Sequence, residues 1–140
     1  MLRLSKKTDY AIVALSHLYE TKLPASVREI ADSYHLSSQM LANVLKMLSS
    51  TGVLISKRGV TGGYSLGKSA ENIFLGEVID IIDGPIQLSD CTSNDNGCRA
   101  EDSCPAKAPI IKIHQRIKSY IDNLSLADIA GKNIGSIAIN

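Results

Sequence analysis

The fold is decided by residues 37–66, SSQMLANVLKMLSSTGVLISKRGVTGGYSL, in which the hydrophobic period changes. In the first part, apolar residues recur at spacings of three and four, which predicts a helix capped by Ser37 and stopped by Gly52. Its apolar positions are Met40, Leu41, Val44, Leu45 and Leu48. In the second part, residues 53–55 and 64–66 flank a glycine-rich segment, which predicts a two-stranded hairpin.

A longer helix is expected before this stretch. Apolar residues between positions 11 and 18 recur at helical spacing and predict a helix over about residues 8–21. Either Ser5 or Thr8 can serve as its N-cap, and Pro24 is expected to end the element.

A short second helix is predicted between the first helix and residue 37. Ser26 and Glu29 have the spacing of a capping box, and the helix is expected to end near Tyr34. Three helices followed by a hairpin are the order of a winged helix-turn-helix. The expected fold class is therefore mainly α with a small β-wing, extended by a long C-terminal helix used for dimerisation.

The second half of the chain predicts a helix over residues 75–82, a long polar loop over residues 89–104, and a helix from about residue 106. The last helix carries apolar residues at alternating spacings of three and four, which favours pairing with a second copy over packing on its own core. They are Ile110, Ile113, Ile117, Tyr120 and Leu124.

The expected organisation has five parts. They are a DNA-binding winged helix-turn-helix (1–69), a connecting helix (70–88), a cysteine-rich cluster-binding loop (89–105), a dimerisation helix (106–124) and a C-terminal segment (125–140). A chain of 140 residues that is 44% hydrophobic can bury one ordinary core, which leaves little for a second independent domain.

The charge balance separates the two halves of the chain. Residues 1–69 hold nine Lys and Arg against four Asp and Glu, a net charge of +5, whereas residues 70–140 hold six against ten, a net charge of −4. A basic N-terminal half suits phosphate, although chance asymmetry is the simpler alternative. The sequence contains no membrane span and no secretory signal, so a cytoplasmic location without a membrane partner is expected.

The winged helix-turn-helix predicts a double-stranded DNA operator as partner, because the third helix of this motif enters the major groove. The candidate contacts are Ser37, Ser38, Gln39, Asn43 and Lys46 on that helix and Lys57, Arg58, Gly62, Gly63 and Tyr64 on the wing. Gln39 and Asn43 share a helix face and can each read an adenine edge, while Arg58 suits a minor groove. The alternatives are that these are solvated polar residues, or that the winged helix binds a protein.

Three cysteines, Cys91, Cys98 and Cys104, lie in the long loop. An odd number of thiols in a reducing compartment fits a disulfide framework poorly, and thiolates are preferred ligands of iron–sulfur clusters and of zinc. The spacing lacks the short pairs of structural zinc sites, so an iron–sulfur cluster of unspecified nuclearity is favoured over zinc or a thiol redox switch. The fourth ligand stays open among Asp90, Asp95, Glu101, Asp102 and His114, and burial or exposure of His114 is favoured over ligation.

The opening residues 1–10 (MLRLSKKTDY), the wing residues 58–66 (RGVTGGYSL) and the cysteine loop with its phrase 101–105 (EDSCP) form a specific combination. This combination resembles the Rrf2 family of repressors, the group of the IscR, NsrR and SUF-system regulators, over nearly the whole chain. The resemblance implies a homodimer that crosses its long C-terminal helices, and a cluster whose loss or change of state alters DNA affinity. It also implies that the three cysteines are cluster ligands, that Arg58 enters a minor groove, and that residues 38–43 form the recognition positions.

Individual positions depart from particular members of that family. Lys107 stands where IscR-like members have a histidine ligand, and Ala42 replaces a glutamate of their recognition helix, so neither their site nor their operator preference is transferred. Asp9 falls where NsrR-like members carry an acidic residue that completes the cluster of the partner subunit; helix capping or a plain surface charge is its alternative role. The opening and the phrase 101–105 look most similar to SUF-system regulators, which implies cluster-assembly genes as targets, with nitric oxide or redox sensing as the rival.

Functions from other classes fit the sequence less well. A cluster carrier or delivery protein would use the same thiols but would need neither a recognition helix nor a wing. An apo winged-helix interaction module would leave the cysteines incidental. Enzymatic turnover is not expected, because no nucleophile, base and orienting group, and no phosphate-binding loop, can be assembled from the motifs present.

Overall fold

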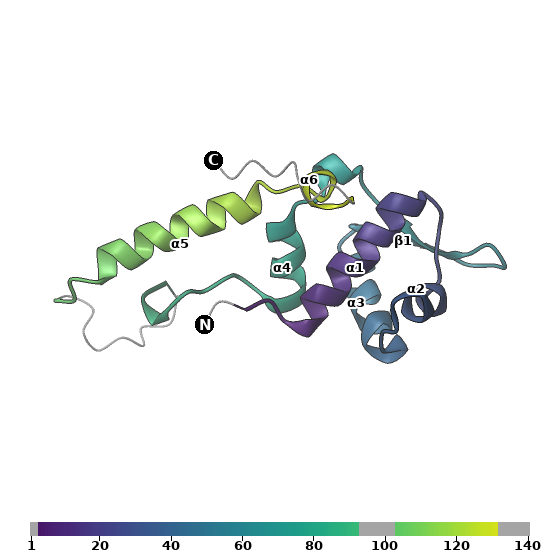
Figure 1. The fold of residues 1–140 in the computed structure, drawn as a ribbon, viewed down its shortest axis with the longest axis horizontal. Helices are drawn as coiled ribbons and strands as arrows, with labels where there is room; N and C mark the ends of the chain where they lie inside the picture. Colours follow the sequence, from purple (N-terminus) through teal and green to yellow (C-terminus); the bar gives the residue numbers. More distant parts are fainter. Residues whose placement is uncertain (1–2, 93–102, 132–140) are drawn as a thin grey trace.

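This computed structural model describes residues 3–92 and 103–131 of the chain. The elements are α1 (Lys6–Thr21), α2 (Val27–Tyr34), α3 (Ser38–Ser50), β1 (Leu54–Lys57), β2 (Gly63–Leu66), η1 (Ala70–Asn72), α4 (Leu75–Asp83), η2 (Asp90–Thr92), α5 (Lys107–Asp122) and α6 (Leu126–Ile129). Figure 1 shows α1–α4, the strands and α6 gathered into one unit, here called the body, from which α5, here called the arm, extends. The predicted fold class, mainly α with a small β-wing in a winged helix-turn-helix, is confirmed.

The N-terminus of α1 begins two residues earlier than expected. Ser5 rather than Thr8 is the N-cap, because the Ser5 hydroxyl accepts a hydrogen bond of 3.1 Å from the Thr8 backbone N–H. The Thr8 side chain is instead buried. The helix ends at Lys22, which has a left-handed φ of 55°, so Pro24 is not what stops it.

The starts of α2 and α3 follow the sequence closely. Ser26 and Glu29 form the predicted capping box of α2, and Ser37 caps α3. The backbone N–H of Ser37 also donates to the Tyr10 hydroxyl at 3.1 Å, which ties the first turn of α3 to α1. The Ser37 cap and the hydrogen bond from Ser37 to Tyr10 therefore fix the orientation of α3 relative to α1.

The core of the body forms between α1, α3 and α4, with side chains from both ends of the chain. Its largest fully buried apolar side chains are Leu15, Ile30, Leu41, Val44, Leu45, Leu48, Val53, Leu54, Ile73 and Val78. The predicted apolar face of α3 is confirmed at Leu41, Val44, Leu45 and Leu48, whereas Met40 packs at the margin. Burial of this face leaves the opposite side of α3 free for contacts with a partner.

The wing is an antiparallel hairpin in which Leu54 pairs with Leu66 and Lys57 pairs with Gly63. Its base is joined to the body by a β-bridge between Ala25 and Tyr64, whose backbone groups exchange hydrogen bonds of 3.0 and 2.8 Å. This bridge attaches the wing to the segment that leads into α2, and it was not anticipated from the sequence.

Two elements after the wing also belong to the body. Helix α4 runs one residue beyond the predicted end, to Asp83, and its inner face joins the core. Helix α6 was not predicted, although Ser125 and Asp128 have capping-box spacing. Its Leu126 is buried, and a bridge between Phe74 and Ser125 joins it to the start of α4. The core therefore continues past residue 69, and it includes the beginning of the C-terminal segment.

The arm is the least buried long helix of the described residues. It is slightly shorter than the predicted span 106–124, and none of its residues is buried. It meets the body at one end, where Asp122 approaches Gly76 so closely that a Cβ at residue 76 would lie 2.9 Å from the Asp122 Cα. Its other half packs against η2, and Figure 1 shows η2 beside the N-terminal half of α5.

Candidate DNA interface and sensor region

The solvent face of α3 carries the predicted base-reading side chains. Gln39, Asn43 and Lys46 are all exposed and follow one another at spacings of four and three, so they form one stripe on the side opposite the buried leucines. Ser37 and Ser38 are exposed at the start of the same helix. Two amides, a lysine and a capping hydroxyl at a helix N-terminus suit base edges and phosphates.

The wing presents cationic side chains at its tip. Lys57 ends β1, Arg58 follows it, and both are exposed. The predicted wing contacts Gly62 and Gly63 have a structural reason to be glycine: a Cβ at residue 62 would collide with the Lys57 carbonyl, and one at residue 63 would lie 2.6 Å from the Ala25 backbone. Tyr64 is half-buried against the core. These three positions shape the wing, and their contact with DNA stays a prediction.

The described cysteines lie on either side of the residues outside the description. Cys91 is in η2 and Cys104 lies just before α5, where its carbonyl accepts a hydrogen bond from the Lys107 N–H at 3.3 Å. Both are half-buried thiols that form no disulfide. Cys98, Asp95, Glu101 and Asp102 lie outside the described residues. We call residues 84–92 and 103–106 the cysteine segment.

Within residues 3–92 and 103–131, no three His, Cys, Asp or Glu side chains lie close enough together to hold a metal ion. Asp9, the predicted ligand from the partner subunit, is exposed in the first turn of α1, where its negative charge also suits the helix N-terminus. Its role as a ligand stays a prediction.

Within the described residues, two polar side-chain atoms are buried without a hydrogen-bond partner: Nδ1 of His114 on α5 and Oγ of Ser89, just before η2. An unpaired buried polar atom costs about 1–3 kcal/mol, so such atoms are uncommon and mark places where a further group can bind. Thiolates and an imidazole are donors that suit iron–sulfur clusters and zinc. The donor types carried by η2, by the turn before α5 and by α5 are therefore of the kind that the predicted cofactor takes.

A hydrogen bond joins the root of the cysteine segment to α1. The buried Thr8 hydroxyl donates to the Asp83 carboxylate at 2.6 Å. Partial burial raises the pKa of Asp83, but this hydrogen bond and the polar groups of the nearby Ser5 outweigh it and hold the pKa below its ordinary value. The sequence predicted only that a helix ends near residue 82, because an interaction across 75 positions leaves no local signal.

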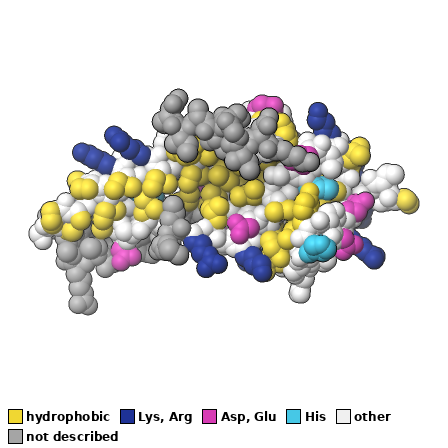
Figure 2. Space-filling view, viewed as in Figure 1, with side chains coloured by type: hydrophobic (Ala, Val, Ile, Leu, Met, Phe, Trp, Pro, Cys, Tyr) yellow, Lys and Arg dark blue, Asp and Glu magenta, His cyan; other side chains and the backbone are white. Residues whose placement is uncertain are grey.

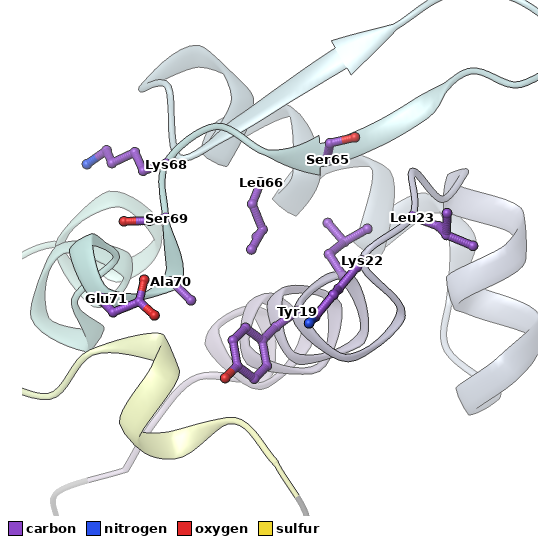
Figure 3. A pocket seen from close by; sticks show the side chains of 10 residues that line it. Tyr19, Lys22, Leu23, Ser65, Leu66, Lys68, Ser69, Ala70 and Glu71 are labelled. Carbon is purple, nitrogen blue, oxygen red and sulfur yellow. The ribbon is translucent and has the colours of Figure 1, made fainter.

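An open cavity of about 450 Å³ lies where the end of α1, β2 and η1 meet (Figure 3). Figure 3 shows Tyr19 and Lys22 from α1 on one side of it and Leu66 between them and Lys68. The Lys68 ammonium donates to the Glu77 carboxylate at 2.6 Å, so this positive charge is already compensated within the body. The cavity is therefore no strongly cationic site.

The arm exposes part of the predicted dimerisation seam. Ile113 and Tyr120 are 54% and 48% exposed, whereas Ile110, Ile117 and Leu124 are half-buried toward the body. Figure 2 shows hydrophobic side chains gathered along the length of α5 on the viewed face. The seam is thus divided between two sides of the helix, and pairing with a second copy stays a prediction. No helix of the described residues is long and apolar enough to span a bilayer.

Solved structures share this fold over nearly the whole chain. CymR (YrzC), described as the global cysteine regulator of B. subtilis, is 29% identical with a TM-score of 0.76, and the match covers 93% of this chain and 97% of that one. The IscR of T. potens is 26% identical with a TM-score of 0.71, covering 91% and 85%. The CymR of Staphylococcus aureus is also 26% identical with a TM-score of 0.71, covering 91% and 98%.

A comparison with protein families agrees with these structures. Residues 4–132 match the Rrf2 family, described as an iron-dependent transcriptional regulator. The match spans the body and the arm together with the residues between them, and its members are regulators rather than enzymes. The chain therefore belongs to the Rrf2 family and is a DNA-binding transcriptional regulator.

Proposed function

We propose that this regulator is a cytoplasmic homodimer that senses through an iron–sulfur cluster held by Cys91, Cys98 and Cys104 and represses cluster-assembly genes. The observation that carries the proposal is that two free, half-buried thiols lie in η2 and just before the arm, and that η2 and the arm pack against each other. A further acidic ligand is Asp9 from the partner subunit.

The exposed stripe of α3 would read the operator. Gln39 and Asn43 each offer an amide that can bind an adenine edge with two hydrogen bonds, and Lys46 suits guanine or phosphate. The wing would place Arg58 in the adjacent minor groove while Lys57 meets the backbone. In a dimer, two such bodies would contact two half-sites.

The cysteine segment has a direct route to α1. It begins at Gly84, next to Asp83, and the Asp83 carboxylate accepts a hydrogen bond from Thr8 at the first turn of α1. Helix α1 in turn packs against α3. A change in the cysteine segment would therefore reach α1 through one carboxylate, and it alters operator affinity only if the two states of the segment bind DNA differently.

When bound, the cluster supplies a centre whose oxidation state and integrity respond to redox conditions. The chain supplies thiolates from two elements, η2 and the turn before α5, so binding would hold the cysteine segment against the arm. Loss of the cluster would release that cross-link.

The test is anaerobic purification with iron and sulfide analysis, followed by operator binding before and after removal of the cluster. We expect stoichiometric iron and sulfide, and an operator affinity that changes on removal. Cys104→Ala should lose the visible absorption yet keep the helical circular dichroism, with the exposed Ser103→Ala as matched control. Colourless protein, iron-poor even after reconstitution, that still binds its operator normally would sink the sensor half of the proposal.

A second pair of variants tests the DNA interface. Arg58→Ala should weaken binding to all DNA and reduce the slope of log affinity against log salt by about one, because one phosphate-region charge is lost. Gln39→Ala should cost about 1–3 kcal/mol on the operator with little change on random DNA. Equal losses on both DNAs for both variants would contradict this division of roles.

A thiol-based regulator without a cluster is the second candidate, favoured by the likeness to CymR, described as a global cysteine regulator. In that case Cys91 and Cys104 would act as free thiols, and redox conditions or thiol modification would change operator affinity in iron-free protein. Measurement of operator binding by iron-free protein under reducing and oxidising conditions separates the two candidates.

A further inference from the structure

We propose that Val60, at the tip of the wing, is a specificity-determining residue whose apolar side chain disfavours guanine in the minor groove of the operator. This inference rests on the proposed function and deepens it, because that proposal gives the wing only cationic contacts with DNA. The observation is that Val60 is 107% exposed, more than any other large hydrophobic side chain in residues 3–92 and 103–131.

A tight turn carries Val60 away from the body. Strand β1 ends at Lys57 and β2 begins at Gly63. Between them the Gly62 N–H donates to the Gly59 carbonyl at 3.0 Å, which closes a four-residue turn with Val60 in a central position. Figure 1 shows the hairpin extending beyond the rest of the body, and Figure 2 shows hydrophobic atoms at that end of the molecule. Val60 is therefore held outward on a closed turn, clear of the core.

The turn itself does not need an aliphatic residue at this position. Central positions of such turns favour Gly, Pro, Asn, Asp or Ser, each for its backbone preference or its local hydrogen bonds. An aliphatic side chain there adds nothing to the core and leaves apolar surface in water, and removal of that surface from water by a partner is favourable. A contact with a partner therefore explains Val60 better than the needs of the hairpin do.

The charges around the turn indicate that this partner is duplex DNA. Residues 53–70 contain three Lys or Arg and no Asp or Glu. Lys68 is paired with Glu77, whereas Lys57 and Arg58 are exposed and form no ion pair with any described residue. Two uncompensated cations next to an apolar apex suit a groove that is lined by phosphates.

An aliphatic side chain in the minor groove distinguishes base pairs by one group. Guanine places its N2 amino group there, whereas an A·T pair has no donor and carries an apolar C2–H at the same place. Against a valine, the guanine amino group would lose its water and gain no acceptor, which is unfavourable for a buried donor. Val60 therefore favours A·T pairs, while the neighbouring Arg58 can donate to their acceptors.

The test uses the full-length protein, cluster-loaded and cluster-free in parallel, and the duplex that the wild type selects most strongly from a randomised pool. Each A·T pair of this duplex is replaced in turn by inosine·cytosine and by G·C. These two pairs are identical in the major groove, and only G·C carries the minor-groove amino group. At one or more positions we expect the wild type to bind the G·C duplex about tenfold more weakly than the inosine·cytosine duplex.

Variants of Val60 should lose this discrimination. Val60→Ala should reduce the ratio to about threefold or less, because the shorter side chain leaves room for water at the amino group. Val60→Thr keeps the shape and adds an acceptor for the amino group, so it should reduce the ratio as well.

Ile55→Ala is the matched control, because Ile55 is an aliphatic residue of the same wing, 47% exposed on β1 and away from the turn. Its ratio should equal that of the wild type. Substitution of a fully exposed side chain leaves stability nearly unchanged, so the Val60 variants should unfold at the wild-type urea concentration. A lost ratio in folded protein then reports the contact itself.

The outcomes distinguish this inference from the proposed function. A wild type that binds the G·C and inosine·cytosine duplexes equally at every position overturns it, and so does a discrimination that both Val60 variants retain. If Arg58→Ala still weakens binding to all DNA in either case, the proposed wing contact stands without Val60. If neither the Arg58 nor the Val60 variants change binding to any DNA, the proposed wing contact fails as well.

Discussion

The body and the arm differ in how much of each helix is buried. In the body, α3 buries four of its thirteen residues and α1 buries six of sixteen, whereas the sixteen residues of α5 bury none. Helices α1 and α3 also have side-chain N-caps, and α5 has none. Helical stability in water comes mostly from packing of an apolar face, so the body is stable through its own core and the arm depends on what covers it.

This difference separates the two halves of the regulator. The body can hold the α3 stripe and the wing in place with no help from a ligand or a second copy. The arm and the cysteine segment have few buried contacts, so their local stability is low. A bound cofactor or a second copy can therefore change their stability more than that of the body.

The largest effect is expected in the core of the body. Leu45→Ala removes a fully buried side chain of α3 and should lower the free energy of unfolding by about 2–5 kcal/mol, measured by urea unfolding followed by circular dichroism. Ile113→Ala on the arm is the matched control and should change it by about 0.5 kcal/mol or less in dilute, monomeric protein. Equal costs at the two positions would break the contrast.

The next effect concerns association. Replacing the two exposed seam residues together, Ile113→Glu with Tyr120→Glu, should weaken dimerisation by about 2 kcal/mol or more, because charges would be desolvated in the interface. Sedimentation velocity over a range of concentrations measures this, and Arg116→Ala serves as a control on the same exposed side. An unchanged dimer would show that the arm is covered in another way.

A smaller effect is expected where the cysteine segment meets the body. The pKa of Asp83 lies below its ordinary value of 3.8, so its hydrogen bonds stabilise the folded protein above that pH and are lost as the pH falls through the folded-state pKa. Thr8→Val should cost about 0.5–1.5 kcal/mol at pH 7 and progressively less below pH 4. Unfolding curves across this range test it.

Thr8→Ser keeps the hydroxyl and is the control for that junction. It should retain the pH dependence even if it packs less well. A Thr8→Val variant with the same acid sensitivity as the wild type would show that this carboxylate plays no part in acid unfolding.

The smallest effect is expected for an ion pair within the arm. Lys118 donates to Asp122 at 2.8 Å, and this hydrogen bond is the main cause that raises the pKa of Lys118. Both side chains are more than a third exposed, so Lys118→Ala should cost only about 0.3–0.5 kcal/mol. The contribution should be present below pH 10.5 and disappear as the pH rises further. A loss above 1 kcal/mol in thermal unfolding would mean that the arm has more stability of its own than its burial indicates.

Local patterns predicted much of the body. The capping box at Ser26, the Ser37 cap and the apolar spacing of α3 all act within a few residues, and the structure confirms them. The Ala25–Tyr64 bridge, the return of α6 to the core and the Thr8–Asp83 hydrogen bond join residues far apart in sequence. No period or cap encodes such contacts, so they could not be predicted.

The candidate site divides in the same way. Exposure of Gln39, Asn43 and Lys46 followed from the helical period, and the structure confirms it. The glycines of the wing were predicted for DNA contact, but the close approach of the Ala25 backbone gives Gly63 a structural need as well. The unpaired Nδ1 of His114 could not be foreseen, because it depends on which side of α5 the rest of the chain covers.

The small bridge between Ala25 and Tyr64 limits how such a regulator can work. It joins the base of the hairpin to the entry of α2, while the Ser37–Tyr10 hydrogen bond joins the start of α3 to α1. If these links hold, a displacement of α1 would move α3 and the wing together. The distance and angle between the two reading surfaces of a dimer would then be the controlled quantity, and binding to operators with altered half-site separation would report it.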